Sequence, residues 1–144
     1  MSDPLLDPDG IDHVECTVPD RDEAADWYRE VLGFEIVDRL DHWAEDPTNP
    51  LMISPDGGAT MLALFAGEPT APGEGSYSHV AVRTGGKAFL AFLEACGDRP
   101  DIEVDGPDQV VDHDQAYSCY FTDPWGHPLE VTTYETAVVA DALP

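Results

Sequence analysis

The chain has 144 residues, of which 42% are hydrophobic, and this is enough for one ordinary globular domain. Its 30 acidic residues outnumber 6 basic ones and give a net charge of −24, which argues against binding to nucleic acid or to anionic membranes. No apolar run approaches the roughly 20 residues that span a bilayer, and the first residues, MSDPLLDPDG, lack the basic and apolar segments of a secretory signal.

The charge and the cysteines predict a cellular setting. Regular strand and helix patterns argue against disorder, and the acids are spread along the chain instead of forming one face for a cationic partner. Self-repulsion is screened at high salt, because the Debye length falls to about 3 Å at 1 M. The 3 cysteines form no CxxC pair and are typical of free thiols in a reducing compartment. We therefore expect a cytoplasmic protein of a salt-accumulating halophile.

The first half of the chain predicts a strand, a helix and three further strands. Ile11 to Val18 alternates between two faces, with His13 and Glu15 on one of them. A helix follows, because Asp20 suits the N-cap position and Gly33 the C′ position on either side of an amphipathic pattern. Further strands are expected at 34–40, near 51–54 and at 60–66.

The second half repeats this plan after a segment rich in Pro, Gly and Glu. Tyr77 to Arg83 predicts a strand that carries His79, and an amphipathic helix ends before Gly97. The turn at 123–126 predicts a hairpin between the last two strands. Strands are expected near 102–104, 109–112, 116–122 and 129–134.

Matching residues recur at a period of roughly 65 positions. His79 follows His13 by 66 residues, and Glu130 follows Ala63 by 67. Each half is therefore predicted to be a βαβββ module, and neither can cover its sheet alone, so the two should share one curved sheet. The expected organisation is an N-terminal tail, a single domain at 10–135 and a C-terminal tail, with the boundaries 1–9, about 10–67 for module 1, 68–75 for the linker, about 76–135 for module 2, and 136–144.

Three potential metal ligands occupy strands at repeat-related places. His13, His79 and Glu130 each fall in a short alternating run, and a sheet fixes the direction of the side chains that it carries. Two histidines and one carboxylate form a facial ligand set for a divalent transition metal, with positions left open for substrate or oxygen. Alone, a strand histidine is more often a packed pocket residue and a strand glutamate a solvent-facing charge. The three together favour a metal site.

The motifs IDHVECTV, DWYREVLGFEIV, SHVAV and YFTDPWGHPLEV resemble the vicinal-oxygen-chelate superfamily. That superfamily includes glyoxalase I, extradiol dioxygenases, fosfomycin-resistance enzymes and bleomycin-binding proteins. The resemblance covers about residues 10 to 135. It implies an α+β fold in which two βαβββ modules form a partly open eight-stranded barrel with a divalent metal inside.

The ligand pattern is most similar to that of one-domain extradiol dioxygenases. These enzymes have one histidine in the first strand of each module and one glutamate in the last strand, as at His13, His79 and Glu130. In that family a tyrosine ten residues before the glutamate holds the substrate oxygen, and Tyr120 has this spacing. A family histidine upstream acts as acid and base, and His113 is the candidate, although a surface role is the plainer interpretation of His113 and a packing role that of Tyr120.

Two other functions stay open. Glyoxalase I-like enzymes have a first-module carboxylate at about the place of Ala63, which cannot bind metal, although Glu15 could substitute as a fourth ligand. A glyoxalase-like lyase or isomerase is therefore one alternative, and a non-catalytic small-molecule binding or resistance protein is the other. The resemblance implies a catechol-type substrate for the dioxygenase and Fe(II) or Mn(II) as the metal, with Zn(II) or Ni(II) as alternatives. A homodimer is compatible with the sequence.

Overall fold

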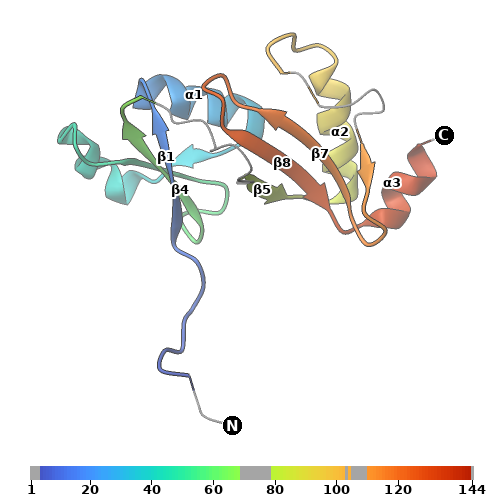
Figure 1. Cartoon of the computed structure of the whole chain (residues 1–144), viewed down its shortest axis with the longest axis horizontal. Helices are drawn as coiled ribbons and strands as arrows, with labels where there is room; N and C mark the ends of the chain where they lie inside the picture. The colour runs from blue at the N-terminus through green and yellow to red at the C-terminus, as the bar shows by residue number, and fades with distance from the viewer. Residues whose placement is uncertain (1–3, 69–78, 103, 105–109, 144) are drawn as a thin grey trace. The chain divides into compact units, whose positions relative to one another are not determined.

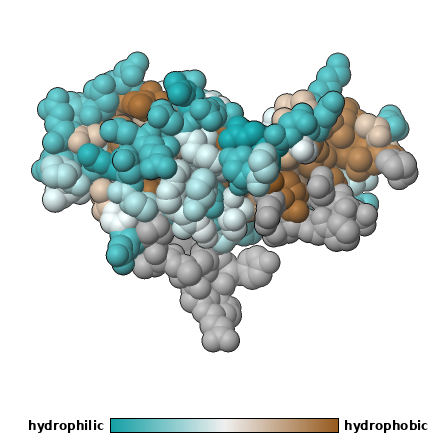
Figure 2. All heavy atoms as spheres, turned by 90° about the horizontal axis from the view of Figure 1, so that it is seen from above, coloured by the Kyte–Doolittle hydropathy of each residue, from teal (hydrophilic) through white to brown (hydrophobic). Residues whose placement is uncertain are grey.

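A computed structural model of the protein describes residues 4–68, 79–102, 104 and 110–143 (Figure 1). The chain divides into two compact units, Met1–Thr70 and Ala71–Pro144. The linker expected at 68–75 lies, except for its first residue, outside the described residues. Figure 2 shows hydrophilic residues over much of the described surface, beside some hydrophobic patches. No helix in these described ranges is long and apolar enough to cross a membrane.

The first unit is built on one mixed sheet. Its elements are β1 (His13–Val18), α1 (Arg21–Leu32), β2 (Glu35–Ile36), the 3-10 helix η1 (Asp38–Glu45), β3 (Leu51–Ser54) and β4 (Met61–Ala66). The strand order is β1-β4-β3-β2, in which β1 and β4 are parallel and the other pairs are antiparallel. Apart from η1, this is the expected βαβββ module.

Local signals set both ends of α1. The Asp20 carboxylate accepts hydrogen bonds from the backbone N–H groups of Asp22 and Glu23, both at 3.0 Å. An N-cap of this kind contributes about 1 kcal/mol. At the other end Gly33 is left-handed with φ 72°, and its N–H bonds to the Arg29 carbonyl at 3.1 Å. The helix bounds therefore follow from the sequence, as expected.

The strand expected at 34–40 is wrong in its length. Within 34–40, only the two residues of β2 pair in the sheet, with β3, and the chain then turns into η1. The Leu40 N–H donates to the Val37 carbonyl at 2.9 Å, which opens this 3-10 turn. The Arg21 guanidinium donates to the Ala44 carbonyl inside η1 at 2.8 Å, and to the Asp46 and Asn49 carbonyls after η1 at 3.5 and 2.6 Å. A cation distant in sequence thus satisfies backbone carbonyls of η1 and of the loop that follows it.

The two faces of this sheet have different neighbours. One face lies against α1 and includes the buried residues Val18, Ile53, Leu62 and Leu64. The other face carries an apolar cluster formed by Val37, Met52, Met61 and Ala63, with Leu40 and Phe65 packed against it. His13 lies opposite Met61, and Glu15 opposite Ala63. Because side chains alternate along a strand, His13 and Glu15 share the face of the apolar cluster.

The second unit has the same plan. Its elements are β5 (Val80–Arg83), α2 (Gly86–Cys96), β6 (Val111–Asp112), β7 (Tyr117–Thr122), β8 (Pro128–Thr133) and α3 (Thr136–Ala142). The strand order is β5-β8-β7-β6, with β5 and β8 parallel. The centre of the strand expected near 102–104 and the start of that near 109–112 lie outside the described residues.

The segment expected as a C-terminal tail at 136–144 contains helix α3. The Gly86 N–H, at the start of α2, donates to the Glu135 carboxylate at 2.6 Å, so Glu135 caps a helix that has no side-chain cap at its own N-cap residue. A Cβ atom on Gly86 would lie 2.7 Å from Cβ of Val138, so the missing side chain permits the close approach of α3. Val139 is fully buried.

The expected fold class is confirmed: the chain is α+β with two βαβββ modules. Strand pairing among the described residues gives two separate four-stranded sheets, so it does not close the expected barrel.

The strand register agrees with the sequence repeat. Ala63 of β4 lies opposite Glu15, and Glu130, 67 residues after Ala63, lies opposite Ala81. In the first module the carboxylate, Glu15, lies on the first strand, β1. In the second module the carboxylate, Glu130, lies on the last strand, β8.

Candidate functional site

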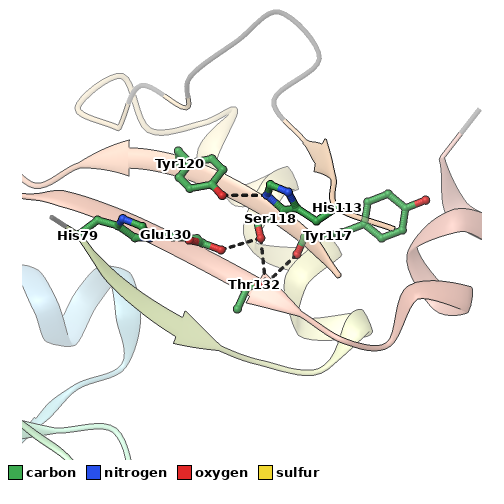
Figure 3. Close-up of polar contacts among 7 residues, drawn as sticks. All are labelled: His79, His113, Tyr117, Ser118, Tyr120, Glu130 and Thr132. Carbon is green, nitrogen blue, oxygen red and sulfur yellow. Dashed lines mark hydrogen bonds and ion pairs between the residues drawn. The ribbon is translucent and has the colours of Figure 1, made fainter. Parts of the chain in front are cut away.

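One face of the second sheet gathers polar side chains from adjacent strands (Figure 3). On the antiparallel strands β7 and β8, Tyr120 lies opposite Glu130, and Ser118 lies opposite Thr132. Side chains alternate along strands, so these four project from the same face. His79 immediately precedes β5, the parallel neighbour of β8, and contacts Glu130. Four of these side chains are therefore carried by hydrogen-bonded strands, which hold side-chain positions better than loops do, whereas His79, expected within a strand, lies just before one.

The opposite face of this sheet is apolar. Its buried residues include Cys119, Phe121, Leu129 and Val131. Helix α2 covers them, and the rings of Phe92 and Phe121 are 5.5 Å apart. Burial raises the pKa of the Cys119 thiol to about 12, with the nearby Cys96 thiol adding to the shift. Cys119 is therefore an inert part of the core. All three cysteines are free thiols, as expected.

His79 and Glu130 form the central contact of the polar face. Nε2 of His79 lies 2.8 Å from Oε1 of Glu130, and the two side chains are 30% and 12% exposed. Two ligand atoms that each lie about 2.1 Å from one ion, at right angles, are about 3 Å apart. An imidazole nitrogen and a carboxylate oxygen are also ligand types that suit divalent iron and manganese. The pair therefore fits neighbouring positions around one divalent ion.

Two hydroxyl groups lie behind the Glu130 carboxylate. The Ser118 hydroxyl oxygen is 2.7 Å from Oε2 of Glu130 and 2.9 Å from the Thr132 hydroxyl oxygen. Thr132 Oγ1 is also 3.2 Å from the Tyr117 carbonyl oxygen. Ser118 is fully buried, and Thr132 nearly so. Neither residue is among the candidates that the sequence predicts, although each lies two positions from one of them on the same strand, and this spacing is the available signal.

A second polar pair lies beside the first. Nε2 of His113 is 2.9 Å from the Tyr120 hydroxyl oxygen, and the two rings are nearly perpendicular, at 87°. The tight turn before β7 presents His113: its N–H donates to the Ala116 carbonyl, and Asp114 takes a left-handed φ of 73°. The Tyr120 ring also meets the ring of His79 at 6.0 Å. Four of the five predicted site residues thus lie together in the second unit.

His13, the fifth candidate, belongs to the first unit. It opens β1, and its Nδ1 lies 2.8 Å from a carboxylate oxygen of Asp12. The His13 side chain is 41% exposed. A carboxylate on one ring nitrogen is the usual way to orient a metal-binding imidazole. Joint ligation by His13, His79 and Glu130 stays a prediction.

The turn between β7 and β8 is held by a buried carboxylate. The Asp123 side chain has no exposed surface; it accepts the N–H groups of Trp125 and His127, both at 2.9 Å, and lies 2.6 Å from Nδ1 of His127. Gly126 supplies the left-handed residue of the turn, with φ 91°. His127 therefore closes the predicted hairpin, which aligns Tyr120 with Glu130.

Several solved structures share this fold. A glyoxalase/dioxygenase from Nostoc punctiforme is 20% identical with a TM-score of 0.66, over 93% of this chain and 99% of that one. The antibiotic binding protein TnmS3 from Streptomyces sp. CB03234 is 24% identical with a TM-score of 0.61, over 90% and 98%. The fosfomycin resistance protein FosX from Listeria monocytogenes is 14% identical with a TM-score of 0.62, over 92% and 98%. These likenesses show the fold and leave the activity open.

A comparison with curated proteins found no match. The family comparison covers most of the chain: residues 10–131 match the Glyoxalase/Bleomycin resistance protein/Dioxygenase superfamily. Proteins of this superfamily bind small molecules and typically hold a divalent metal. The sequence motifs, the paired βαβββ modules and this match agree. The chain belongs to the Glyoxalase/Bleomycin resistance protein/Dioxygenase superfamily.

Proposed function

We propose that the protein is a metal-dependent enzyme that cleaves a catechol-type ring in an extradiol dioxygenase reaction. The observation that supports the proposal most is the placement of two polar pairs on one face of a sheet. His79 and Glu130 offer a nitrogen and an oxygen 2.8 Å apart, and Tyr120 with His113 offers a hydroxyl and an imidazole 2.9 Å apart. The first pair suits a metal, and the second suits proton transfer.

In this proposal each side chain has one task. His79 and Glu130, together with His13, would hold Fe(II) or Mn(II). The bound ion would supply Lewis acidity, which lowers the pKa of a substrate hydroxyl. Tyr120 would donate a hydrogen bond from its hydroxyl to a substrate oxygen. His113 would take up or return a proton at Nε2.

A glyoxalase-like lyase is the competing function. It would need a group that moves a proton next to a carbonyl carbon, and Glu15, opposite Ala63 on β1, is the carboxylate available for this role. We favour the dioxygenase because the Tyr120 and His113 pair has no task in the lyase.

Two measurements test the proposal. The metal content of protein purified without chelator should approach one divalent ion per chain. Oxygen uptake should then be followed with a panel of substituted catechols. Uptake that requires the metal supports the dioxygenase. If no catechol gives uptake and an α-ketoaldehyde–thiol adduct is converted instead, the lyase replaces it. Tight small-molecule binding without turnover would make the protein a binder.

A further inference from the structure

The buried hydroxyl groups of Ser118 and Thr132 form a short chain that ends on Glu130. The oxygen–oxygen distances are 2.7 Å from Ser118 to Glu130 and 2.9 Å from Ser118 to Thr132. Ser118 is fully buried and Thr132 is 8% exposed. Buried polar groups are normally satisfied by protein partners, and here the partners are one another and the carboxylate.

The number of protons sets the direction of this chain. Each hydroxyl has one proton to donate, and an ionised carboxylate can only accept. Hydrogen bonds to a charged acceptor are shorter and stronger than neutral ones, which assigns the Ser118 proton to the 2.7 Å contact with Oε2 of Glu130. Because Ser118 has no second proton, Thr132 is assigned as the donor in the 2.9 Å contact between the two hydroxyl groups. The Tyr117 carbonyl oxygen, at 3.2 Å, is the more distant acceptor for the same Thr132 proton.

The consequence is a difference between the two oxygens of one carboxylate. Oε2 of Glu130 is occupied by Ser118, whereas Oε1 lies beside Nε2 of His79. We propose that Ser118 is a positioning residue that presents Oε1 of Glu130 alone to the metal, with Thr132 supporting Ser118 from behind. This inference rests on the metal site of the proposed function. It predicts that the carboxylate binds the ion through one oxygen.

Removing the Ser118 hydroxyl should weaken metal binding because Ser118 is fully buried. Ser118→Ala leaves Oε2 of Glu130 without its donor, and no surface is exposed at Ser118 through which bulk water would replace the hydroxyl. Side chains that orient metal ligands typically contribute 10–100-fold in affinity, so we expect a loss of about this size. Ser118→Thr keeps a hydroxyl on a side chain suited to a strand and should restore much of the affinity.

The test is Mn(II) binding by titration calorimetry on the full chain in buffered KCl, with the melting temperature of each metal-free variant. Thr133→Val is the matched control. It also removes a fully buried hydroxyl from β8, on the opposite face, where that hydroxyl accepts the Glu135 N–H. This control should lose stability and keep the parent affinity. Thr132→Val should weaken binding less than Ser118→Ala does.

The outcomes separate the two proposals. If Glu130→Ala binds Mn(II) as tightly as the parent, the metal site and the proposed function are wrong. If Glu130→Ala loses binding while Ser118→Ala keeps the parent affinity, only the role of Ser118 is overturned. Should Ser118→Ala fail to fold, Thr132→Val decides: severalfold weaker binding supports the inference, and unchanged binding overturns it.

Discussion

Replacing Tyr120 with phenylalanine separates a chemical role from a packing role. The change removes one oxygen, which lies 2.9 Å from Nε2 of His113, and it leaves the ring contacts with His79 and His113 in place. The loss of one such hydrogen bond costs about 1 kcal/mol of stability. A positioned donor that acts in the reaction is worth about 10²–10⁴-fold in rate, or about 3–5 kcal/mol of activation free energy. The effect on rate should therefore clearly exceed the effect on stability.

Oxygen consumption with the best catechol and the melting temperature should be measured on the same preparations. Tyr117→Phe is the matched control, because Tyr117 lies on the same strand and Figure 3 shows its phenol pointing away from the His113 and Tyr120 pair. We expect Tyr120→Phe to keep its metal and lose turnover, and Tyr117→Phe to keep both. Equal turnover in the parent and Tyr120→Phe would refute the chemical role and leave Tyr120 as a packing residue.

Three further predictions concern the metal, salt and acid. His79→Ala and Glu130→Ala should each lose bound metal in elemental analysis at high salt, and full occupancy in both would remove the site. The melting temperature should rise between dilute buffer and about 1 M KCl, because salt screens the −24 charge; a flat response would contradict the halophile prediction. The Thr60 N–H and the Ser54 hydroxyl lower the pKa of Asp56 to about 2, so the stability that Asp56 contributes should be present above pH of about 4 and lost towards pH 2. Asp56→Asn should thus melt below the parent at pH 6, and the difference should shrink in acid; a constant difference would exclude this linkage.

Features with a local cause could be predicted from the sequence. The strand at His13 follows from alternation, and α1 follows from a capping aspartate and a closing glycine. The placement of Tyr120 opposite Glu130 also follows from local information, since a short turn joins their strands.

Features that depend on distant partners could not be predicted. The 3-10 helix η1 and the loop after it receive hydrogen bonds from the distant Arg21 guanidinium, at the Ala44 and Asn49 carbonyls. Helix α3 packs closely against Gly86, about fifty residues earlier in the chain, because that residue has no side chain to meet Val138. Serine and threonine in a strand carry no functional signal by themselves. The strand register and the hydrogen bond from Ser118 to Glu130 identify Ser118 and Thr132 as parts of the site.

The Glu135 cap has a practical consequence for handling the protein. Glu135 completes the first turn of α2, and α2 lies behind the strand that carries Tyr120. Proteolytic removal of residues 135–144 would take away α3 and this cap together. Loss of activity after such trimming would then originate in the scaffold and not in the reacting residues.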